Sequence, residues 1–191
     1  MKKKMSTGKI VGISIAVVAV ILILWFVGSY NGLVGADETV NEKWGNVQSA
    51  YQRRVDLIPN LIATVQASAD FETNLQTQVT AMRTGVSSAA SPGDLDKVGV
   101  EIESAINLVF ENYPQVKSTE NFLSLQDQLE GTENRIKTDR DIYNKAVKGL
   151  NIRVRRFPTN IVAGMFGFEK EDMFEADVGA EKAPDVKNLF K

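Results

Sequence analysis

The sequence predicts an all-α protein: an antiparallel up-and-down helical bundle of long, kinked helices, preceded by a single transmembrane helix. Two observations predict this fold. Apolar side chains recur every three or four residues along most of the chain, the spacing that places them on one face of an α-helix. A nearly continuous apolar run near the N-terminus, residues 10–28, has about the 20 residues that a helix needs to cross a bilayer.

Residues 10–28 contain Ser14 as their only strongly polar side chain. Four lysines lie in the basic stub before them, residues 1–9, and two acidic residues follow at 37 and 38. This charge bias predicts a cytoplasmic N-terminus and a helical domain outside the cytoplasmic (inner) membrane. A cleaved signal peptide ending near 34–36 is the alternative, but the apolar run exceeds the usual length of about 7–15 residues. We therefore expect a single-pass anchor that contacts the lipid bilayer through residues 10–28.

The longest apolar seam starts at Leu33 and continues in helical spacing to Met82. Its first part leaves the predicted span with few obvious segments to cover it, and exposed apolar surface costs about 25 cal/mol per Å². We therefore expect a homo-oligomer. The expected oligomer seam consists of Leu33, Val40, Trp44, Val47 and Tyr51. Two arrangements stay open: a long hairpin that must oligomerise, and a compact four-helix bundle that covers its own core.

Pro59 interrupts this seam, and a proline inside a helix removes one backbone hydrogen bond. Either it kinks one continuous helix or the chain turns back there. The apolar phase continues unchanged from Val55 and Ile58 to Ile62, and no glycine or polar loop follows. This pattern favours a kinked helix over a turn.

Later segments repeat the helical spacing between clear breaks. Residues 85–94 are rich in glycine, serine and proline and predict a loop. A second helix follows and breaks at Asn112-Tyr113-Pro114, because the residue before proline avoids the helical region. The next helix, capped at Ser118 or Thr119, runs to Phe157-Pro158.

Charged residues interrupt the seam of that last helix at Asp139 or Arg140. Either these side chains remain in water or they pair internally, since charged groups are rarely buried unpaired. The candidate partners are Arg53 and Arg54 for Asp139, and Asp56 and Glu133 for Arg140.

An apolar segment with two glycines, residues 159–168, ends the predicted bundle domain, which spans 29–168. It suits a short helix and turn that close one end of the bundle; a membrane-surface or partner-docking patch is the alternative reading. Residues 169–191 form an acidic tail that we expect to be mobile, with Val186, Leu189 and Phe190 as candidates for docking a last turn.

The composition excludes many classes of site. The chain has no cysteine and no histidine, which removes cysteine and serine–histidine nucleophiles and zinc sites of the usual kind. It contains no phosphate-binding loop, dinucleotide turn or calcium loop. Net charge is −2, and four of the lysines precede the span, so the acidic body disfavours nucleic acid. We predict no catalytic residue, no cofactor and no metal.

Several blocks of unusual sequence occur in a fixed order and resemble the signature blocks of the LemA family. They are Tyr30-Asn31-Gly32-Leu33-Val34, Arg53-Arg54-Val55-Asp56-Leu57-Ile58-Pro59-Asn60-Leu61, Asn112-Tyr113-Pro114, Gly131-Thr132-Glu133-Asn134-Arg135-Ile136, Tyr143-Asn144 and Phe157-Pro158. The resemblance implies a bacterial membrane-anchored helical bundle without catalytic residues or cofactor to carry over. Val55 stands where the family block usually has histidine, which argues against an essential imidazole.

The central block defines the candidate site. Its polar and proline residues are Arg53, Arg54, Asp56, Pro59 and Asn60. Either they brace the kink or they form a notch where the helix or peptide of an envelope protein inserts. We expect a membrane-anchored scaffold or adaptor that self-associates and binds other proteins. A signal-transmitting membrane sensor is the alternative, and an enzyme built on carboxylates such as Glu101 is a weaker one, because general acid–base catalysis needs facing groups in a pocket.

Overall fold

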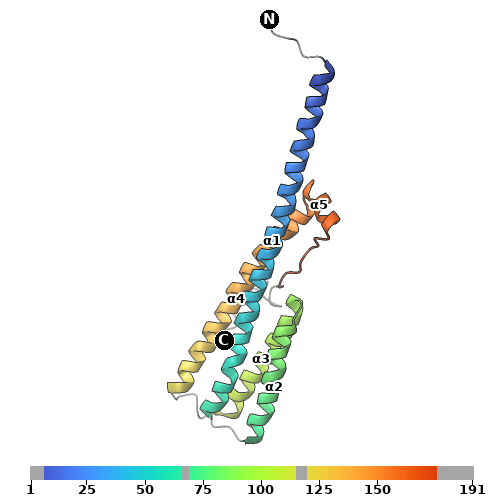
Figure 1. Cartoon of the computed structure of the whole chain (residues 1–191). Helices are drawn as coiled ribbons and strands as arrows, with labels where there is room; N and C mark the ends of the chain where they lie inside the picture. The colour runs from blue at the N-terminus through green and yellow to red at the C-terminus, as the bar shows by residue number, and fades with distance from the viewer. Residues whose placement is uncertain (1–6, 66–68, 115–119, 176–191) are drawn as a thin grey trace, which may run out of the picture. The chain divides into compact units, whose positions relative to one another are not determined.

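The computed structural model describes residues 7–65, 69–114 and 120–175. Every regular element in these ranges is a helix (Figure 1): α1 (Thr7–Val65), α2 (Ala69–Ser88), α3 (Pro92–Asn112), α4 (Glu120–Arg155) and α5 (Thr159–Phe166). The described ranges contain no strand. The all-α prediction is confirmed.

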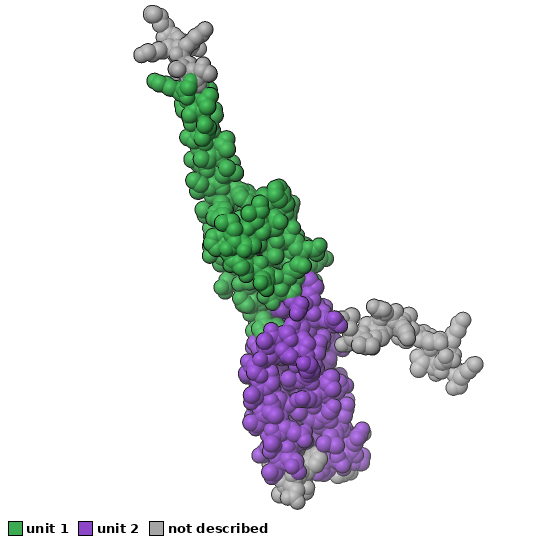
Figure 2. Space-filling model, turned by 90° about the vertical axis from the view of Figure 1, so that its right-hand side faces the viewer, with its two compact units in different colours: residues 1–46, 145–171 green, residues 47–144, 172–191 purple. Residues whose placement is uncertain are grey.

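The helices group into two compact units, coloured separately in Figure 2. The first unit takes the chain up to residue 46 together with 145–171, and the second takes 47–144 and the chain from 172 onward. Helices α1 and α4 each contribute residues to both units. Each unit is described by itself below.

The second unit is a four-helix bundle. The C-terminal part of α1, then α2, α3 and the first part of α4 alternate in direction (Figure 1), as predicted. Each helix presents its apolar stripe to the centre. The buried core side chains are Val47, Tyr51, Val55, Ile58, Leu61, Ile62 and Val65 from α1, Leu75, Val79 and Met82 from α2, Leu95, Ile102 and Val109 from α3, and Phe122, Leu125, Leu129 and Ile136 from α4. Of the two arrangements left open by the sequence, the compact bundle is the one observed.

Helix α1 continues through Pro59 to Val65, so the expectation that the chain does not turn at this proline is confirmed. The prediction of one long apolar seam was wrong in one respect. It does not lie on one helix up to Met82, because α1 ends at Val65 and α2 starts at Ala69. Both helices carry the same apolar period, and the period alone does not show where one ends and the next begins.

The predicted loop 85–94 is also shorter in the structure, since α2 extends to Ser88 and α3 starts at Pro92. Gly85 lies inside α2, where an added Cβ would be 2.9 Å from Cγ2 of Val98 on α3. Glycine there permits close helix packing rather than a turn. Gln48 of α1 reinforces the end of α2 by donating hydrogen bonds to the carbonyl oxygens of Val86 (3.0 Å) and Ala89 (3.4 Å).

Helix α3 has a regular start and ends where the sequence predicts. The hydroxyl of Ser91 accepts a hydrogen bond from the backbone N–H of Asp94 at 3.3 Å, and Pro92 follows this N-cap, a favourable position for proline. The helix ends at Asn112, immediately before Tyr113-Pro114. The predicted caps at Ser118 and Thr119 lie outside the described residues.

The first unit contains the N-terminal part of α1, the end of α4, and α5. Among the described residues, one helix is long and apolar enough to cross a membrane, namely α1. Its most apolar 18-residue stretch has a mean hydropathy of 3.1, and none of that stretch is buried. Its apolar side chains between 10 and 24 are therefore free to face lipid, as expected for residues 10–28.

Self-association was expected because the seam at residues 33–51 had few obvious segments to cover it, but the structure covers this seam within one chain. Leu33, Val40, Val47 and Tyr51 are buried within the single chain, and Trp44 is half-buried. Leu33 packs against Val162 and Ala163 of α5, with Phe26, Val154 and Phe168 around them. The apolar segment after Pro158 folds back and covers α1, so this seam does not require a second copy of the chain.

Candidate functional site

The charged residues of the central block contact different helices of the second unit. Arg54 forms an ion pair with Glu133 of α4. Asp56 accepts hydrogen bonds on Oδ1 from Arg83 of α2, with distances of 2.9 Å to Nε and 2.7 Å to the terminal nitrogen. Since successive residues of a helix point about 100° apart, neighbouring charges of one block can tie α1 to α4 and α2. The brace reading fits these contacts.

Arg54 is the most buried cation of the block, with a side chain that is 17% exposed. Burial lowers the pKa of Arg54 from its ordinary value, opposed by the negative charge of Glu103 and by Tyr51. Its Nε atom is buried and has no hydrogen-bond partner among the described residues. The guanidinium remains charged, because arginine does not deprotonate in proteins, and Glu133 compensates much of that charge.

Asp139 and Arg140 do pair internally, but not with the predicted partners. Buried Asp139 accepts from Arg135 at 2.7 Å, one turn earlier on α4. Arg140 pairs with Asp96 of α3 at 2.9 Å and lies 4.5 Å from the ring centre of Phe174. The predicted pairing of Asp139 with Arg53 or Arg54 is wrong. The predicted pairing of Arg140 with Asp56 or Glu133 is wrong as well. Arg135 is one turn from Asp139 on the same helix, so the two side chains are close without any contact between helices. The pairing of Arg140 with Asp96 depends on the packing of α3 against α4, which the sequence of α4 does not indicate.

Pro59 and Asn60 lie near the C-terminal end of α1. Pro59 is half-buried inside α1, and Asn60 is exposed. The Asn60 carbonyl accepts a hydrogen bond from the Thr64 hydroxyl at 2.8 Å. Neither residue lines the two grooves described below, and a notch at the proline stays a prediction.

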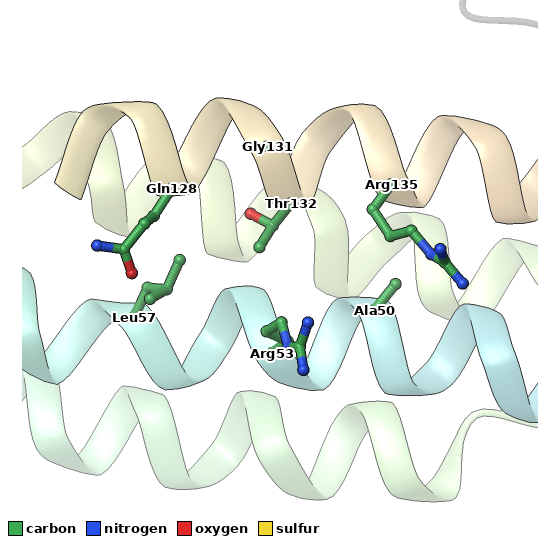
Figure 3. A pocket seen from close by; sticks show the side chains of 7 residues that line it. All are labelled: Ala50, Arg53, Leu57, Gln128, Gly131, Thr132 and Arg135. Atoms are coloured by element: carbon green, nitrogen blue, oxygen red, sulfur yellow. The ribbon is translucent and has the colours of Figure 1, made fainter. Parts of the chain in front are cut away.

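An open groove lies between α1 and α4, within the three turns of α1 that precede the proline (Figure 3), and has a volume of about 540 Å³. Its lining residues are Ala50, Arg53 and Leu57 from α1, and Gln128, Gly131, Thr132 and Arg135 from α4. Of the predicted site residues, Arg53 alone lines it. The remaining lining residues escaped sequence reasoning, because α4 could not be placed against α1 without the fold.

The groove combines an apolar base with positive charge. Ala50 and Leu57 supply carbon surface, and no side-chain or foreign backbone atom lies within 4 Å of where a Cβ on Gly131 would stand. The side chain of Arg135 extends from α4 toward α1, and that of Arg53 lies over α1 (Figure 3). Arg135 is held by Asp139, whereas Arg53 is exposed and makes no ion pair within the described residues. Arg53 is thus an available anion-binding group beside apolar surface.

A second, polar groove of about 530 Å³ lies over α1, α3 and α4. Its lining includes Arg54, Glu103, Glu133 and Arg140, all of which take part in the ion pairs or charge interactions described above. Its charges are largely compensated within the bundle.

Asn144 of α4 is a structural residue that sequence reasoning did not identify. Within the second unit, its amide donates to the carbonyl of Phe174 at 3.0 Å and accepts from the N–H of the same residue at 2.9 Å. The Tyr143 hydroxyl donates to the carbonyl of Asp172 at 3.1 Å. Phe174 is buried as a result. The segment 172–175 of the predicted tail is therefore hydrogen-bonded to α4.

In the first unit, another asparagine of α4 makes the same pair of hydrogen bonds to the backbone. The amide of Asn151 donates to the carbonyl of Glu171 at 2.8 Å and accepts from its N–H at 2.9 Å. The start of the predicted tail is thus fixed here as well. Residues 176–191, including Val186, Leu189 and Phe190, lie outside the described residues.

Over the described ranges, no three acidic side chains gather closely enough to hold a metal ion. Glu101, the carboxylate considered for catalysis, is exposed on α3.

These features define a membrane-associated helical protein: a four-helix bundle and a long apolar helix able to span a bilayer. The model of the LemA family matches residues 43–188, and the chain belongs to the LemA family, as its sequence blocks predicted. The magnetosome proteins MamQ 1 and MamQ 2 of Paramagnetospirillum magneticum are each 24% identical to it, over 93% of this chain and 78% of theirs. Protein LemA of Metamycoplasma hominis is 24% identical, over 79% of this chain and 71% of its own.

Proposed function

We propose that the protein is a membrane-anchored adaptor whose α1–α4 groove binds an acidic, amphipathic segment of an envelope protein. The observation that carries this proposal is Arg53, an exposed guanidinium without an ion pair among the described residues, beside the apolar surface of Leu57. Arginine binds carboxylates through two parallel hydrogen bonds, and apolar surface supplies most of the favourable free energy of association. Together they suit a segment that carries an acidic residue next to an apolar one.

The dimensions of the groove agree with such a role. A volume of about 540 Å³ falls within the usual range of about 300–1,000 Å³ for ligand pockets. It is large enough for a few side chains of a partner helix or peptide. The positive charge of Arg53 and Arg135 would disfavour a basic segment, so the same residues supply selectivity.

We also propose that residues 10–28 cross the bacterial cytoplasmic membrane once, with the N-terminus in the cytoplasm and the bundle outside. The lysines before the span and the exposed apolar side chains along it support this orientation. A reporter fused to the C-terminus tests it. Reporter activity on the cytoplasmic side would contradict the orientation.

Self-association is a separate proposal. The buried residues Leu33, Val40, Val47 and Tyr51 no longer support it, so any contact between copies would use another surface. The mass of the full chain in a detergent micelle, measured by native mass spectrometry, distinguishes a monomer from an oligomer.

A photo-crosslinking amino acid placed at Gln128 tests the groove in intact cells. Gln128 is exposed and lines the groove, and Asp127, its exposed neighbour on α4 outside that lining, is the matched control. We expect an adduct with a foreign protein at 128 and not at 127. Mass spectrometry should place it on a segment with acidic and apolar residues.

The role of Arg53 is tested with the same crosslinking experiment. Arg53→Lys keeps the positive charge and should retain the adduct, whereas Arg53→Glu should abolish it. An adduct that persists in the Arg53→Glu chain, or that forms equally at 127, would contradict the proposal. An adduct with a second copy of the chain would contradict the adaptor role of this groove and support self-association.

A further inference from the structure

Helix α5 and the turn before it expose large apolar side chains on the first unit. Phe157 is 76% exposed, Met165 67%, Ile161 52% and Phe166 49%. Phe157, Ile161 and Met165 are four residues apart, and the pair within α5 therefore shares one helix face. Contiguous apolar patches on a protein surface mark contact with a membrane or with another protein.

The opposite face of α5 is fixed to the first unit. Val162 and Ala163 are buried against Leu33 of α1. Gly167 closes the helix in the left-handed conformation, with φ of 74°. The exposed side chains are thus held outward by a packed and capped helix. The short helix expected in this segment is observed, and its buried residues Val162 and Ala163 pack within the first unit.

The position of α5 along α1 indicates what covers the outward face. The ring of Phe166 lies 4.7 Å from that of Tyr30 and 5.9 Å from that of Phe26. Phe26 belongs to the predicted span, and Tyr30 follows directly after it. The exposed patch on α5 is therefore continuous with the exposed apolar surface of the span, at the depth where α1 leaves the bilayer.

Two exposed arginines adjoin the patch. Arg155 and Arg156 precede Phe157, and neither makes an ion pair within the described residues. The third arginine of this stretch, Arg153, is engaged differently, since it donates to the carbonyl of Gly32 at 2.5 Å. Apolar side chains on one face of a short helix, with arginines beside them, characterise helices that lie in the lipid headgroup layer.

We infer that α5 is an interfacial membrane helix. Phe157, Ile161 and Met165 lie at the boundary between headgroups and acyl chains, and Arg155 and Arg156 bind the phosphates of anionic lipids. The occupant of the patch is the lipid surface rather than a protein, because the patch is joined to the span that enters the same bilayer. This inference is independent of the α1–α4 groove.

Spin-label accessibility in reconstituted full-length protein tests the inference. The chain has no native cysteine, so single cysteines can be introduced and labelled directly. Met165→Cys reports the patch, and two further positions calibrate it. Leu24→Cys lies in the span, and Lys148→Cys is exposed on α4 of the same unit.

In vesicles of phosphatidylcholine and phosphatidylglycerol, the label at 165 should collide with oxygen more than with a water-soluble nickel complex, as at 24. The label at 148 should show the reverse. A label at 165 that behaves like the one at 148 would place α5 in water and overturn the inference. Protection from both reagents would indicate a protein partner and overturn it as well.

Lipid composition tests the arginines separately. Adding phosphatidylglycerol to phosphatidylcholine vesicles should shift the label at 165 deeper in the native background. The shift should vanish in Arg155→Gln/Arg156→Gln, with the circular dichroism of the chain unchanged. A shift of equal size in both backgrounds would refute the assignment of the arginines to lipid phosphates.

Discussion

Replacing Gly85 by alanine should destabilise the second unit, although alanine is the better helix former. The substitution gains about 1 kcal/mol of intrinsic helix propensity. The new methyl group would lie 2.9 Å from Cγ2 of Val98, and overpacking of a core costs about 1–3 kcal/mol. Val98 is β-branched and stiff, so it yields little. We expect a net loss of about 1 kcal/mol, equivalent to a fall of about 2–8 °C in Tm for a domain of this size.

Gly131→Ala is the matched control, because Gly131 also lies in a helix of the second unit but faces open space. It should gain about 1 kcal/mol from helix propensity alone. Circular dichroism melts of the detergent-solubilised full chain measure both. In a Val98→Ala background the cost of Gly85→Ala should disappear, since the contact is removed. Stabilisation by Gly85→Ala equal to that by Gly131→Ala would refute the close α2–α3 packing.

Three further changes have defined outcomes. Leu33→Ala should cost about 2–5 kcal/mol of stability, because Leu33 is fully buried, and native mass spectrometry should show an unchanged number of copies. Asn144→Ala removes both hydrogen bonds to Phe174, so hydrogen exchange at the Phe174 amide should accelerate. A hydrogen bond from the Ser91 hydroxyl holds the pKa of Asp94 below its ordinary value, so Ser91→Ala should raise that pKa in an NMR titration. Ionised Asp94 stabilises the folded chain above its unfolded pKa, and this contribution is lost as pH falls through the lower folded pKa.

The helices themselves could be predicted because their signal is local. Apolar residues at steps of three and four fix which face of a helix is buried, and Val55, Ile58 and Ile62 carry that phase across Pro59. The breaks at Tyr113-Pro114 and Phe157-Pro158 follow from the geometry of proline. Boundaries without proline were less predictable. Nothing in the pattern distinguishes the end of α1 at Val65 from a continuing helix.

Tertiary contacts could not be predicted to the same degree. The sequence showed that Leu33 must be covered, but not that α5 covers it from residues 162 and 163. The partners in the ion pairs were predicted wrongly for the same reason. Arg140 had several acidic candidates of similar chemistry, and the fold places Asp96 beside it. In the candidate site, Arg53 was identified by its block, whereas Arg135 required the placement of α4 beside α1.

Charge reversal across the α1–α4 groove tests the central claim most directly. Once the crosslink at Gln128 has located the acidic residue of the partner, that residue is changed to lysine in cells that carry Arg53→Glu. We predict that Arg53→Glu alone abolishes the adduct and that the paired reversal restores it. If the adduct is insensitive to Arg53→Glu, or if the reversed partner fails to restore it, the groove is not the surface through which this protein binds.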